Sequence, residues 1–347
     1  AAFWIISSFK NKWIRIAIAT LLILGMTTPI THIFRNYPLQ YIYYNKLVGG
    51  VNNAYEKYET DYYIVSLNEG TSWVKQNLIS KNDSISKMRI ASNGPDDLTG
   101  YYFRDYSEEL TCNYTRYYDR GASDWDYGIF YCNYIAPFQI QKGYYPPGKT
   151  IHEIKVDDVT VCAVVERITK LDHQGIHLAR AGISQQDINK LLKGIRLMEE
   201  SLELDPHNEV VYRDLANAYI QVGEFEKARN TISKVLMFYP DYDKALNILG
   251  YSYLAEGEAK SKIQLVDRAI GVFHDVIDIN FKNSFAYHYL GVSFTIKNED
   301  QRAIDYFNKA VEYNPRLIQS YYGIANILDR NGQSERAAQV RRYASSL

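Results

Sequence analysis

The sequence predicts three consecutive parts: one membrane-spanning helix, an α+β domain, and an all-α superhelix built from repeated helical hairpins. Three observations support this fold class. An apolar run without charged residues lies near the N-terminus, apolar and polar residues alternate in the middle of the chain, and a residue pattern recurs at a 34-residue spacing toward the C-terminus. We place these parts at residues 1–35, 36–168 and 169–347.

The apolar run covers residues 16–33, which read IAIATLLILGMTTPITHI and include no Asp, Glu, Lys or Arg. As a helix, these residues would extend about 27 Å, close to the ~30 Å hydrocarbon core of a bilayer. Basic residues gather before the run, whereas only Arg35 follows it closely. The positive-inside rule therefore predicts a cytoplasmic N-terminal flank. We expect a membrane anchor through residues 14–33, with the rest of the chain on the periplasmic or extracellular side.

Two alternatives to a membrane anchor stay open. A cleaved signal peptide would need a small-residue cleavage site of the A-x-A kind, which the run lacks. A buried soluble helix is the other alternative, because Pro29 and several Thr residues weaken the pattern of a span. The chain begins Ala1-Ala2 without methionine, and apolar residues 3–6 precede the basic flank. We therefore expect the chain to be processed or cut from a longer one.

The region from Asn36 to about Arg167 mixes helix and strand patterns, which favours a small sheet with at least one helix on one face. The spacing of apolar residues predicts a helix over residues 68–79. Alternation around Asp157-Asp158 predicts a β-hairpin over residues 151–168 with a two-residue turn. Short strands are predicted over residues 86–91 and 128–132, and loops over residues 92–97 and 143–148.

From about Gln185 onward the chain repeats one pattern, in which Leu or Ile precedes a small residue, an aromatic or apolar residue follows three positions later, and Ala comes farther on. The copies begin at Leu215-Ala216, Leu249-Gly250, Leu290-Gly291 and Ile324-Ala325. Two of the spacings are 34 residues and the middle one is 41, so we expect about seven extra residues near Glu258–Gln264. Before the first copy, Met198, Leu202 and Pro206 resemble the second helix of a partial repeat. The pattern resembles the tetratricopeptide-repeat family, whose hairpins stack into a superhelix with a concave face.

The first helix of each repeat supplies a predicted partner-binding groove. In this family, the residues two before and two after the repeat Leu are expected to point inward. These residues are Arg213, Asn217, Asn247, Tyr251, His288, Val292, Tyr322 and Asn326. A row of Arg, Asn, His and Tyr suits a protein or peptide with polar or acidic groups. The set departs from the carboxylate-clamp subfamily, which weighs against capture of a C-terminal carboxylate. A solvated face without a dedicated ligand is the alternative.

A Tyr-rich motif with a Gly pair follows the apolar run. It reads YPLQYIYYNKLVGG over residues 37–50 and continues AYEKYETDYYIVS over residues 54–66. Together with the hairpin around residues 156–165, this motif resembles the segment after the last transmembrane helix in polytopic bacterial membrane glycosyltransferases. Those enzymes depend on lipid-phospho-sugars and are related to the protein mannosyltransferases. The resemblance covers about residues 36–168 and the preceding helix, and the motif residues are Tyr43, Asn45, Gly49, Gly50, Asp61 and Tyr62.

What the resemblance implies is an exported, non-catalytic C-terminal part of such an enzyme, with repeats appended. In that family, catalysis is assigned to an N-terminal membrane half that this sequence does not include, so no residue here inherits a catalytic role. A glycan or a lipid-linked sugar is a further ligand that the resemblance suggests. Independently of the family, the cluster of Tyr37, Tyr41, Tyr43 and Tyr44 suits a membrane interface, because tyrosine tolerates both phases.

Composition argues against several other functions. The 39 basic and 40 acidic residues give a net charge of −1, which removes the electrostatic basis for nucleic-acid binding. The nucleotide and hydrolase motifs and the CxxC pair are missing, so we expect no cofactor and no metal. Cys112 and Cys132 could pair in an oxidising compartment, with free thiols as the alternative. His173 and His177 share a helix face but have too few companions for a metal site.

Three functional hypotheses follow. The first is the glycosyltransferase part described above, with the repeats binding a protein partner or acceptor. The second is a single-span, membrane-anchored adaptor that scaffolds an envelope complex. The third and weakest makes the middle domain a carbohydrate-binding module or hydrolase, in which Asp124 and Asp126 would be the carboxylates facing a sugar. Solvated loops are the plainer explanation for those two residues.

Overall fold

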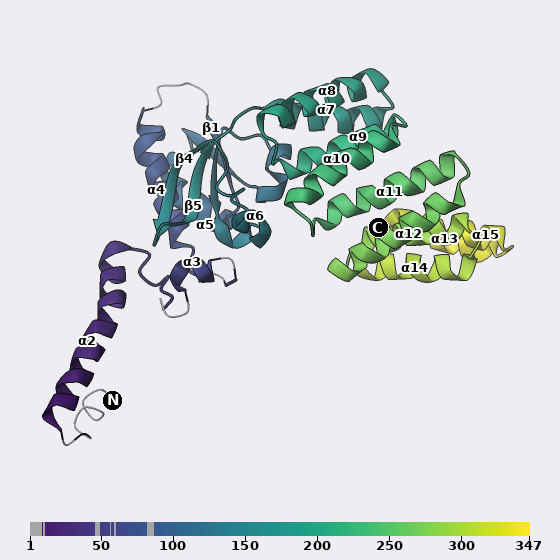
Figure 1. The fold of residues 1–347 in the computed structure, drawn as a ribbon. Helices are drawn as coiled ribbons and strands as arrows, with labels where there is room; N and C mark the ends of the chain where they lie inside the picture. The colour runs from purple at the N-terminus through teal and green to yellow at the C-terminus, as the bar shows by residue number, and fades with distance from the viewer. Residues whose placement is uncertain (1–8, 10, 46–48, 56, 59, 82–86) are drawn as a thin grey trace. The chain divides into compact units, whose positions relative to one another are not determined.

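The computed structural model describes residues 9, 11–45, 49–55, 57–58, 60–81 and 87–347. The chain divides into two compact units, residues 1–168 and residues 169–347 (Figure 1). Unit 1 contains a long apolar helix and a small mixed sheet, and unit 2 is entirely helical. The apolar residues 3–6 and the start of the strand predicted over residues 86–91 lie outside the described residues.

The apolar helix α2 covers Lys12–Arg35 and contains Pro29. Its first turn is capped by the side chain of Asn11, which accepts a hydrogen bond from the backbone N–H of Trp13 at 2.9 Å. Only 6% of its most apolar window is buried in the molecule. Length and composition make α2 the candidate membrane span among the described residues. Because so little of its apolar surface is covered, α2 differs from the core helix of a soluble domain.

The sheet of unit 1 has five strands in the order β2-β1-β3-β5-β4. The strands are β1 Met88–Ser92, β2 Leu110–Tyr114, β3 Tyr127–Tyr131, β4 Thr150–Val156 and β5 Val159–Glu166. β1 runs parallel to β2 and β3, whereas β5 runs antiparallel to β3 and β4. Tyr131 at the end of β3 pairs with Cys162 near the start of β5. The β4–β5 turn therefore lies at the same edge as the C-terminal ends of the parallel strands, and we call this side the C-terminal edge.

The predicted β-hairpin is confirmed. Val156 pairs with Val159 across a two-residue turn, and Asp157 and Asp158 have φ values of 47° and 70°. Positive φ at both turn residues is the geometry that matches the twist of the flanking strands. The expected alternation in burial is missing from β5, where every residue except Glu166 is buried. A strand covered on both faces loses that alternation.

Along the sequence, the shorter helices of unit 1 precede the first strand or connect successive strands. They are α3 Gly50–Ala54, α4 Val65–Asn77, α5 Asp96–Tyr102 and α6 Pro137–Gln141, with short 3-10 turns at Ile79–Lys81, Arg104–Tyr106, Tyr117–Ala122 and Cys132–Tyr134. The helix predicted over residues 68–79 is confirmed as α4, which starts three residues earlier. The loop predicted over residues 92–97 is shorter than expected, because Ser92 ends β1 and Asp96 begins α5.

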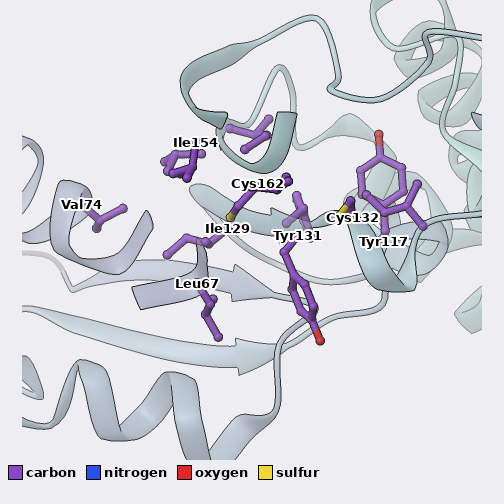
Figure 2. Close-up of a cluster of buried hydrophobic side chains, with 14 of the residues drawn as sticks. Leu67, Val74, Tyr117, Ile129, Tyr131, Cys132, Ile154 and Cys162 are labelled. Atoms are coloured by element: carbon purple, nitrogen blue, oxygen red, sulfur yellow. The ribbon is translucent and has the colours of Figure 1, made fainter. Parts of the chain in front are cut away.

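The core of unit 1 forms where α4 packs on the sheet. Figure 2 shows Leu67 and Val74 of α4 close to Ile129 and Cys162, and all four are fully buried. The approach is close at Gly70, where an added Cβ would lie 3.0 Å from the side chain of Ile129. Cys112, Cys132 and Cys162 are all free thiols, so the pairing of Cys112 with Cys132 is not formed.

Unit 2 consists of five successive helical hairpins. Their first helices are α7 Leu171–Gln185, α9 Glu209–Gln221, α11 Asp243–Ala259, α13 Ser284–Ile296 and α15 Ile318–Arg330. Their second helices are α8 Ile188–Leu204, α10 Phe225–Phe238, α12 Ile263–Ile279, α14 Asp300–Tyr313 and α16 Ser334–Ser345. The pattern of small and aromatic residues explains the close packing: a Cβ on Gly250 would lie 2.5 Å from Phe273, and one on Gly291 would lie 2.6 Å from Phe307.

Two details of the repeats differ from the expectation. Met198 belongs to a complete hairpin rather than a partial repeat, because α7 pairs with α8 along its length. The extra residues predicted near Glu258–Gln264 do not form a loop. They lengthen both α11 and α12 to 17 residues, compared with 13 and 14 in the neighbouring hairpin of α13 and α14.

Candidate protein-interaction surface

The first helices of unit 2 contact one another in succession. We call the surface formed by α7, α9, α11, α13 and α15 the inner surface. In a stacked helical superhelix one helix of each hairpin lines the concave side, where extended partners bind. The side chains that connect neighbouring first helices therefore show which groups face a partner and which ones hold the stack together.

A charged cluster connects α7 to α9. Arg180 donates from Nε and Nη2 to the two carboxylate oxygens of Asp214, at 2.7 and 3.1 Å. Arg213 donates to the same carboxylate from Nε at 3.2 Å and Nη2 at 2.8 Å. Two guanidinium groups thus share one carboxylate, and these three groups carry a net charge of +1. Arg213 was predicted to face the groove, whereas Arg180 and Asp214 were missed.

Asn247, in the middle of the predicted groove, connects α11 to the start of α13. Its side-chain N–H donates to Oδ1 of Asn283 at 3.0 Å, and that oxygen also accepts from the backbone N–H of Ala286. Asn283 in turn donates to Asp243 at 3.0 Å. Because Asn283 caps α13, its amide orientation is fixed, and so is that of Asn247. The structure buries Asn247, so its observed contacts are between repeats.

Aromatic side chains occupy the inner surface farther along. Tyr251 of α11 stacks on Tyr289 of α13, with ring centroids 5.2 Å apart, and Tyr289 also stacks on Phe273 at 5.2 Å. Phe285 and Tyr322 are exposed on α13 and α15. Tyr251 and Tyr322 were predicted as groove residues, whereas Phe285 and Tyr289 were not. The inner surface thus has a charged N-terminal half and an aromatic C-terminal half.

His288 on α13 is half-buried and lies with Nδ1 2.9 Å from Oγ of Ser320 on α15. Burial lowers the pKa of His288 to about 4, so the imidazole is neutral at physiological pH. A neutral ring between two repeats contributes packing and one hydrogen bond. It adds no charge to the groove, which changes the electrostatic role expected from the sequence.

The remaining predicted groove residues differ in their surroundings. Asn217 and Val292 are half-buried, and Asn326 is exposed. Asn326 accepts a hydrogen bond from Nη2 of Arg341 at 2.9 Å, and Arg341 also pairs with Asp329. Whether any of the groove residues binds a partner stays a prediction.

The Tyr-rich motif of unit 1 is organised around Asp61, which is fully buried. The carboxylate of Asp61 accepts from the backbone N–H groups of Val65 and Ser66, at 3.1 and 3.2 Å, and from the hydroxyls of Ser66 and Tyr41. These bonds satisfy backbone donors in the first turn of α4, which explains why the helix starts before its apolar pattern does. Asp61 therefore has a structural role, and Tyr62 beside it is exposed.

The other motif residues lie before α3 or at its first residue. Gly49 has a φ of 97° and Gly50 a φ of 66°, a region that glycine occupies without strain. Gly50 donates its backbone N–H to the backbone oxygen of Asn45 at 3.1 Å. The ring of Tyr43 packs edge-on against His32 at 5.0 Å, so it lies against the end of α2.

The end of α2 is attached to the β4–β5 turn by a polar junction. His32 Nδ1 lies 3.0 Å from Oδ2 of Asp157, while Asn36 donates to Oδ1 of Asp157 at 2.8 Å and accepts its backbone N–H at 3.1 Å. Next to it, Arg35 donates to Asp158 at 2.9 Å. Burial would raise the pKa of Asp157, but the hydrogen bonds from Asn36 and His32 hold this pKa below its usual range. This sequence-distant contact fixes the end of α2 beside the β4–β5 turn.

A cavity of about 390 Å³ borders the motif and the loop after β3, lined by Tyr55, Lys57, Tyr58, Thr60, Cys132, Asn133, Ile135, Pro137 and Ile140. Several of its polar groups bond within the protein: Lys57 donates to Asn53 at 2.7 Å, and Thr60 lies 3.4 Å from Sγ of Cys132. Burial raises the pKa of Cys132 to about 12, so this thiol stays protonated and is no nucleophile at neutral pH.

The residues that the sequence offered as catalytic or metal-binding candidates make contacts with other residues of the protein. Arg89 donates to Asp126 at 3.1 and 3.2 Å and also pairs with Asp124, so one guanidinium holds both carboxylates. The rings of His173 and His177 lie 4.3 Å apart on α7. Among the described residues, no group of three or more His, Cys, Asp and Glu side chains could hold a metal ion.

Comparisons with known proteins identify the helical pattern. Two family models described as "Tetratricopeptide repeat" match residues 189–251 and residues 306–339. Unit 2 therefore contains tetratricopeptide repeats, a module that serves protein–protein interaction and scaffolding. The stretch between the two matches includes the end of the lengthened helix α11 and all of α12.

Curated relatives resemble part of the chain. It is 25% identical over 191 residues to a peroxisomal targeting signal receptor of Saccharomyces cerevisiae, a match that covers 45% of this chain and 31% of the receptor. It is 27% identical over 120 residues to the photosystem I assembly protein Ycf3 of Acaryochloris marina, covering 33% of this chain and 71% of that protein. A match to the anaphase-promoting complex subunit CDC16 of S. cerevisiae has 24% identity and covers 19% of that subunit. The chain thus spans less than a third of the receptor and of CDC16.

Part of this chain is also similar to solved structures. One of them is MamA, at 22% identity and a TM-score of 0.36, with 48% of this chain and 92% of that chain covered. TTC0263, a thermophilic tetratricopeptide protein of Thermus thermophilus, has 16% identity and a TM-score of 0.42, with 49% of this chain and 97% of that chain covered.

Proposed function

We propose that this chain is a membrane-anchored protein-interaction module, whose repeats bind an extended segment of a partner protein along the inner surface. The observation that carries this proposal is the division of that surface into a charged half at Arg180, Arg213 and Asp214 and an aromatic half at Tyr251, Phe285 and Tyr322. Relatives named for reception of a targeting signal and for assembly of a photosystem have roles of the same kind.

The chemistry of the two halves indicates what the partner segment contains. The side chain of Arg180 is 47% exposed beside Asp214, so an acidic side chain can dock on its guanidinium through charge-assisted hydrogen bonds. The exposed rings of Phe285 and Tyr322 offer apolar area with little conformational entropy to lose. We therefore expect an extended segment with an acidic residue at one end and an apolar or aromatic residue at the other.

Site-specific photo-crosslinking tests this proposal. A benzophenone amino acid at Tyr322, on the inner surface, is compared with one at Met237, which is exposed on the second helix α10. Both variants are expressed as full chains in native membranes. We expect a defined crosslinked protein from position 322 and none from position 237.

A second variant ties the adduct to the charged half. Arg180→Glu replaces a half-exposed guanidinium and reverses the charge that would attract an acidic group. It should weaken the adduct at position 322 by about tenfold, as expected for the loss of one charge-assisted contact. Equal crosslinking from positions 322 and 237, or an adduct insensitive to Arg180→Glu, would contradict binding along the inner surface.

The finer proposal concerns the membrane and the enzyme family. Support for a membrane anchor comes from the exposed apolar surface of α2, and support for export comes from the basic residues before it. The resemblance of residues 36–168 supports a non-catalytic, exported part of a membrane glycosyltransferase, with a glycan or lipid-linked sugar as a further ligand. The coding DNA on the 5′ side of the Ala1 codon tests this. An in-frame run of further apolar segments is expected, and a start codon directly before Ala1 would leave the single-span adaptor.

A further inference from the structure

Four exposed tyrosines of unit 1 lie at the C-terminal edge of its sheet. Tyr37, Tyr62, Tyr63 and Tyr134 are between 59% and 79% exposed, although tyrosine usually buries much of its ring. We call these four residues the tyrosine patch. They come from three different parts of the sequence, so their common location results from the fold.

Hydrogen bonds place each member of the patch at the C-terminal edge of the sheet. Tyr134 follows the end of β3, and Asn133 next to it donates to the backbone oxygen of Asp61 at 3.1 Å. Asp61 is therefore held at this edge, and Tyr62 and Tyr63 directly follow it. Tyr63 packs edge-on against Tyr41 and against Tyr62, each with ring centroids 5.3 Å apart.

The same edge holds the end of the apolar helix. Tyr37 follows Asn36, which bonds to Asp157 in the β4–β5 turn, and that turn lies at the C-terminal edge. Tyr41, Tyr43 and Tyr44, which the sequence also suggested for a membrane interface, are instead half-buried and pack inward. The members of the tyrosine patch thus follow α2, the buried Asp61 and β3 directly in the sequence.

We propose that the tyrosine patch is a second membrane contact, which lies in the headgroup region of the bilayer and holds unit 1 against the membrane surface. This inference rests on the proposed function, because it needs α2 in the membrane. Tyrosine suits this position, since its ring favours the apolar side of the interface and its hydroxyl the wet side. The polar junction at His32, Asn36 and Asp157 keeps the C-terminal edge next to the exit of α2.

This arrangement also explains the buried Asp61 within a tyrosine-rich motif. Hydrogen bonds to its carboxylate and backbone fix Asp61, and so they fix the chain that presents Tyr62 and Tyr63. A flexible loop would lose conformational entropy on each contact with lipid, whereas a fixed one does not. Asp61 is therefore a positioning residue for the patch.

Fluorescence quenching by brominated lipid tests the inference on the full chain in phosphatidylcholine vesicles. One variant carries Tyr62→Trp, and the matched control carries Ile151→Trp at the start of β4, at the opposite edge of the sheet. Subtracting the emission of the unsubstituted chain isolates each introduced indole. With bromine near the headgroup, we expect quenching at position 62 to exceed that at position 151 by about twofold or more, as for an interfacial aromatic residue. Tyr63→Trp repeats the measurement at a neighbouring position.

The outcomes separate this inference from the membrane anchor itself. Alkaline extraction of the same vesicles shows whether α2 is inserted. If the chain resists extraction but the indole at position 62 is quenched no more than that at position 151, the patch does not touch the bilayer and the inference fails alone. If alkali releases the chain, the anchor and the patch contact both fail. If maltooligosaccharide shifts the emission at position 62 and lipid does not quench it, the patch is a sugar-binding surface and the inference is overturned.

Discussion

At the scale of single residues, Asp61 shows how a motif residue acts through structure. Its buried carboxylate accepts two backbone N–H groups of α4 and two hydroxyls. Asp61→Ala leaves those donors without an acceptor, so we expect the free energy of unfolding of unit 1 to fall by about 2–4 kcal/mol. All four tryptophans, Trp4, Trp13, Trp73 and Trp125, precede residue 169, so tryptophan fluorescence during denaturant unfolding reports unit 1.

The control for Asp61→Ala is an aspartate on the surface of the same unit. The side chain of Asp105 is 78% exposed and pairs only loosely with Arg104, at 3.6 Å. Asp105→Ala should change the free energy of unfolding by less than about 0.5 kcal/mol. Equal effects of the two substitutions would show that Asp61 contributes no more than a solvated carboxylate.

His288 makes the stability of unit 2 depend on pH. Burial lowers its pKa to about 4, compared with 6.5 for an ordinary histidine. Between these two pH values His288 is therefore largely protonated in the unfolded chain and neutral in the folded chain. The stabilisation is complete above pH 6.5 and is lost as the pH falls toward 4, by at most about 3 kcal/mol. Circular dichroism of unfolding at pH 7 and pH 4.5 should show a smaller loss of stability for His288→Gln than for the unsubstituted chain.

His274, which is exposed on α12, provides the comparison for that measurement. His274→Gln should retain the full pH dependence of the unsubstituted chain. A pH dependence that is the same in all three proteins would mean that folding does not lower the pKa of His288.

The sequence could place residues on a helix face but not assign their partners. Arg213, Tyr251 and Tyr322 were identified from their positions relative to the repeat Leu, and they do lie on first helices. Arg180 was missed because α7 follows its Leu178-Ala179 pair with Gly182 instead of an aromatic residue, so no repeat was recognised there. The burial of Asn247 and His288 depends on Asn283 and Ser320 in the next repeat, a contact that spacing within one repeat does not reveal.

At the scale of elements, the α7–α8 hairpin is held together by glycines rather than by aromatic side chains. A Cβ on Gly194 would lie 2.5 Å from the backbone N of Ala179 and 2.8 Å from the backbone oxygen of Gly175. Backbone cannot move aside as a flexible side chain can, so Gly194→Ala should destabilise unit 2 by about 1–3 kcal/mol, despite the better helix propensity of alanine. Thermal unfolding followed by circular dichroism measures this loss.

Gly271 on α12 is the matched control, because a Cβ there would meet no heavy atom within 4 Å. Gly271→Ala should raise the stability of unit 2 by about 0.5–1 kcal/mol, through helix propensity alone. If Gly194→Ala were also stabilising, the two helices would be packed less closely than the structure shows.

The elements of unit 1 were easier to predict where a local signal existed. The β4–β5 hairpin followed from alternation and Asp157-Asp158, whereas the early start of α4 depends on Asp61, four residues before the helix. The sheet order could not be predicted, because β3 pairs with β5 across more than 25 residues of chain. The glycine packing of α7 against α8 likewise lacked the aromatic residues that marked the other repeats.

At the scale of the whole molecule, the main feature is the apolar surface of α2, which the rest of unit 1 does not cover. Its central side chains Leu21, Ile23 and Leu24 are between 59% and 68% exposed. A soluble chain would have to cover that surface by self-association, whereas a bilayer covers it without further contacts. The two possibilities differ in how the chain responds to a charge placed at the middle of the helix.

Ile23→Asp places such a charge near the midpoint of α2. A charged residue at the centre of a span costs about 2.5–3.5 kcal/mol of insertion free energy, so the fraction of chain that resists alkaline extraction from membranes should fall severalfold. Ile188→Asp adds the same charge at an exposed position on α8 and should leave that fraction unchanged. If Ile23→Asp instead resists extraction as well as Ile188→Asp does, α2 is covered by protein rather than lipid, and the tyrosines at the C-terminal edge would then face a partner chain.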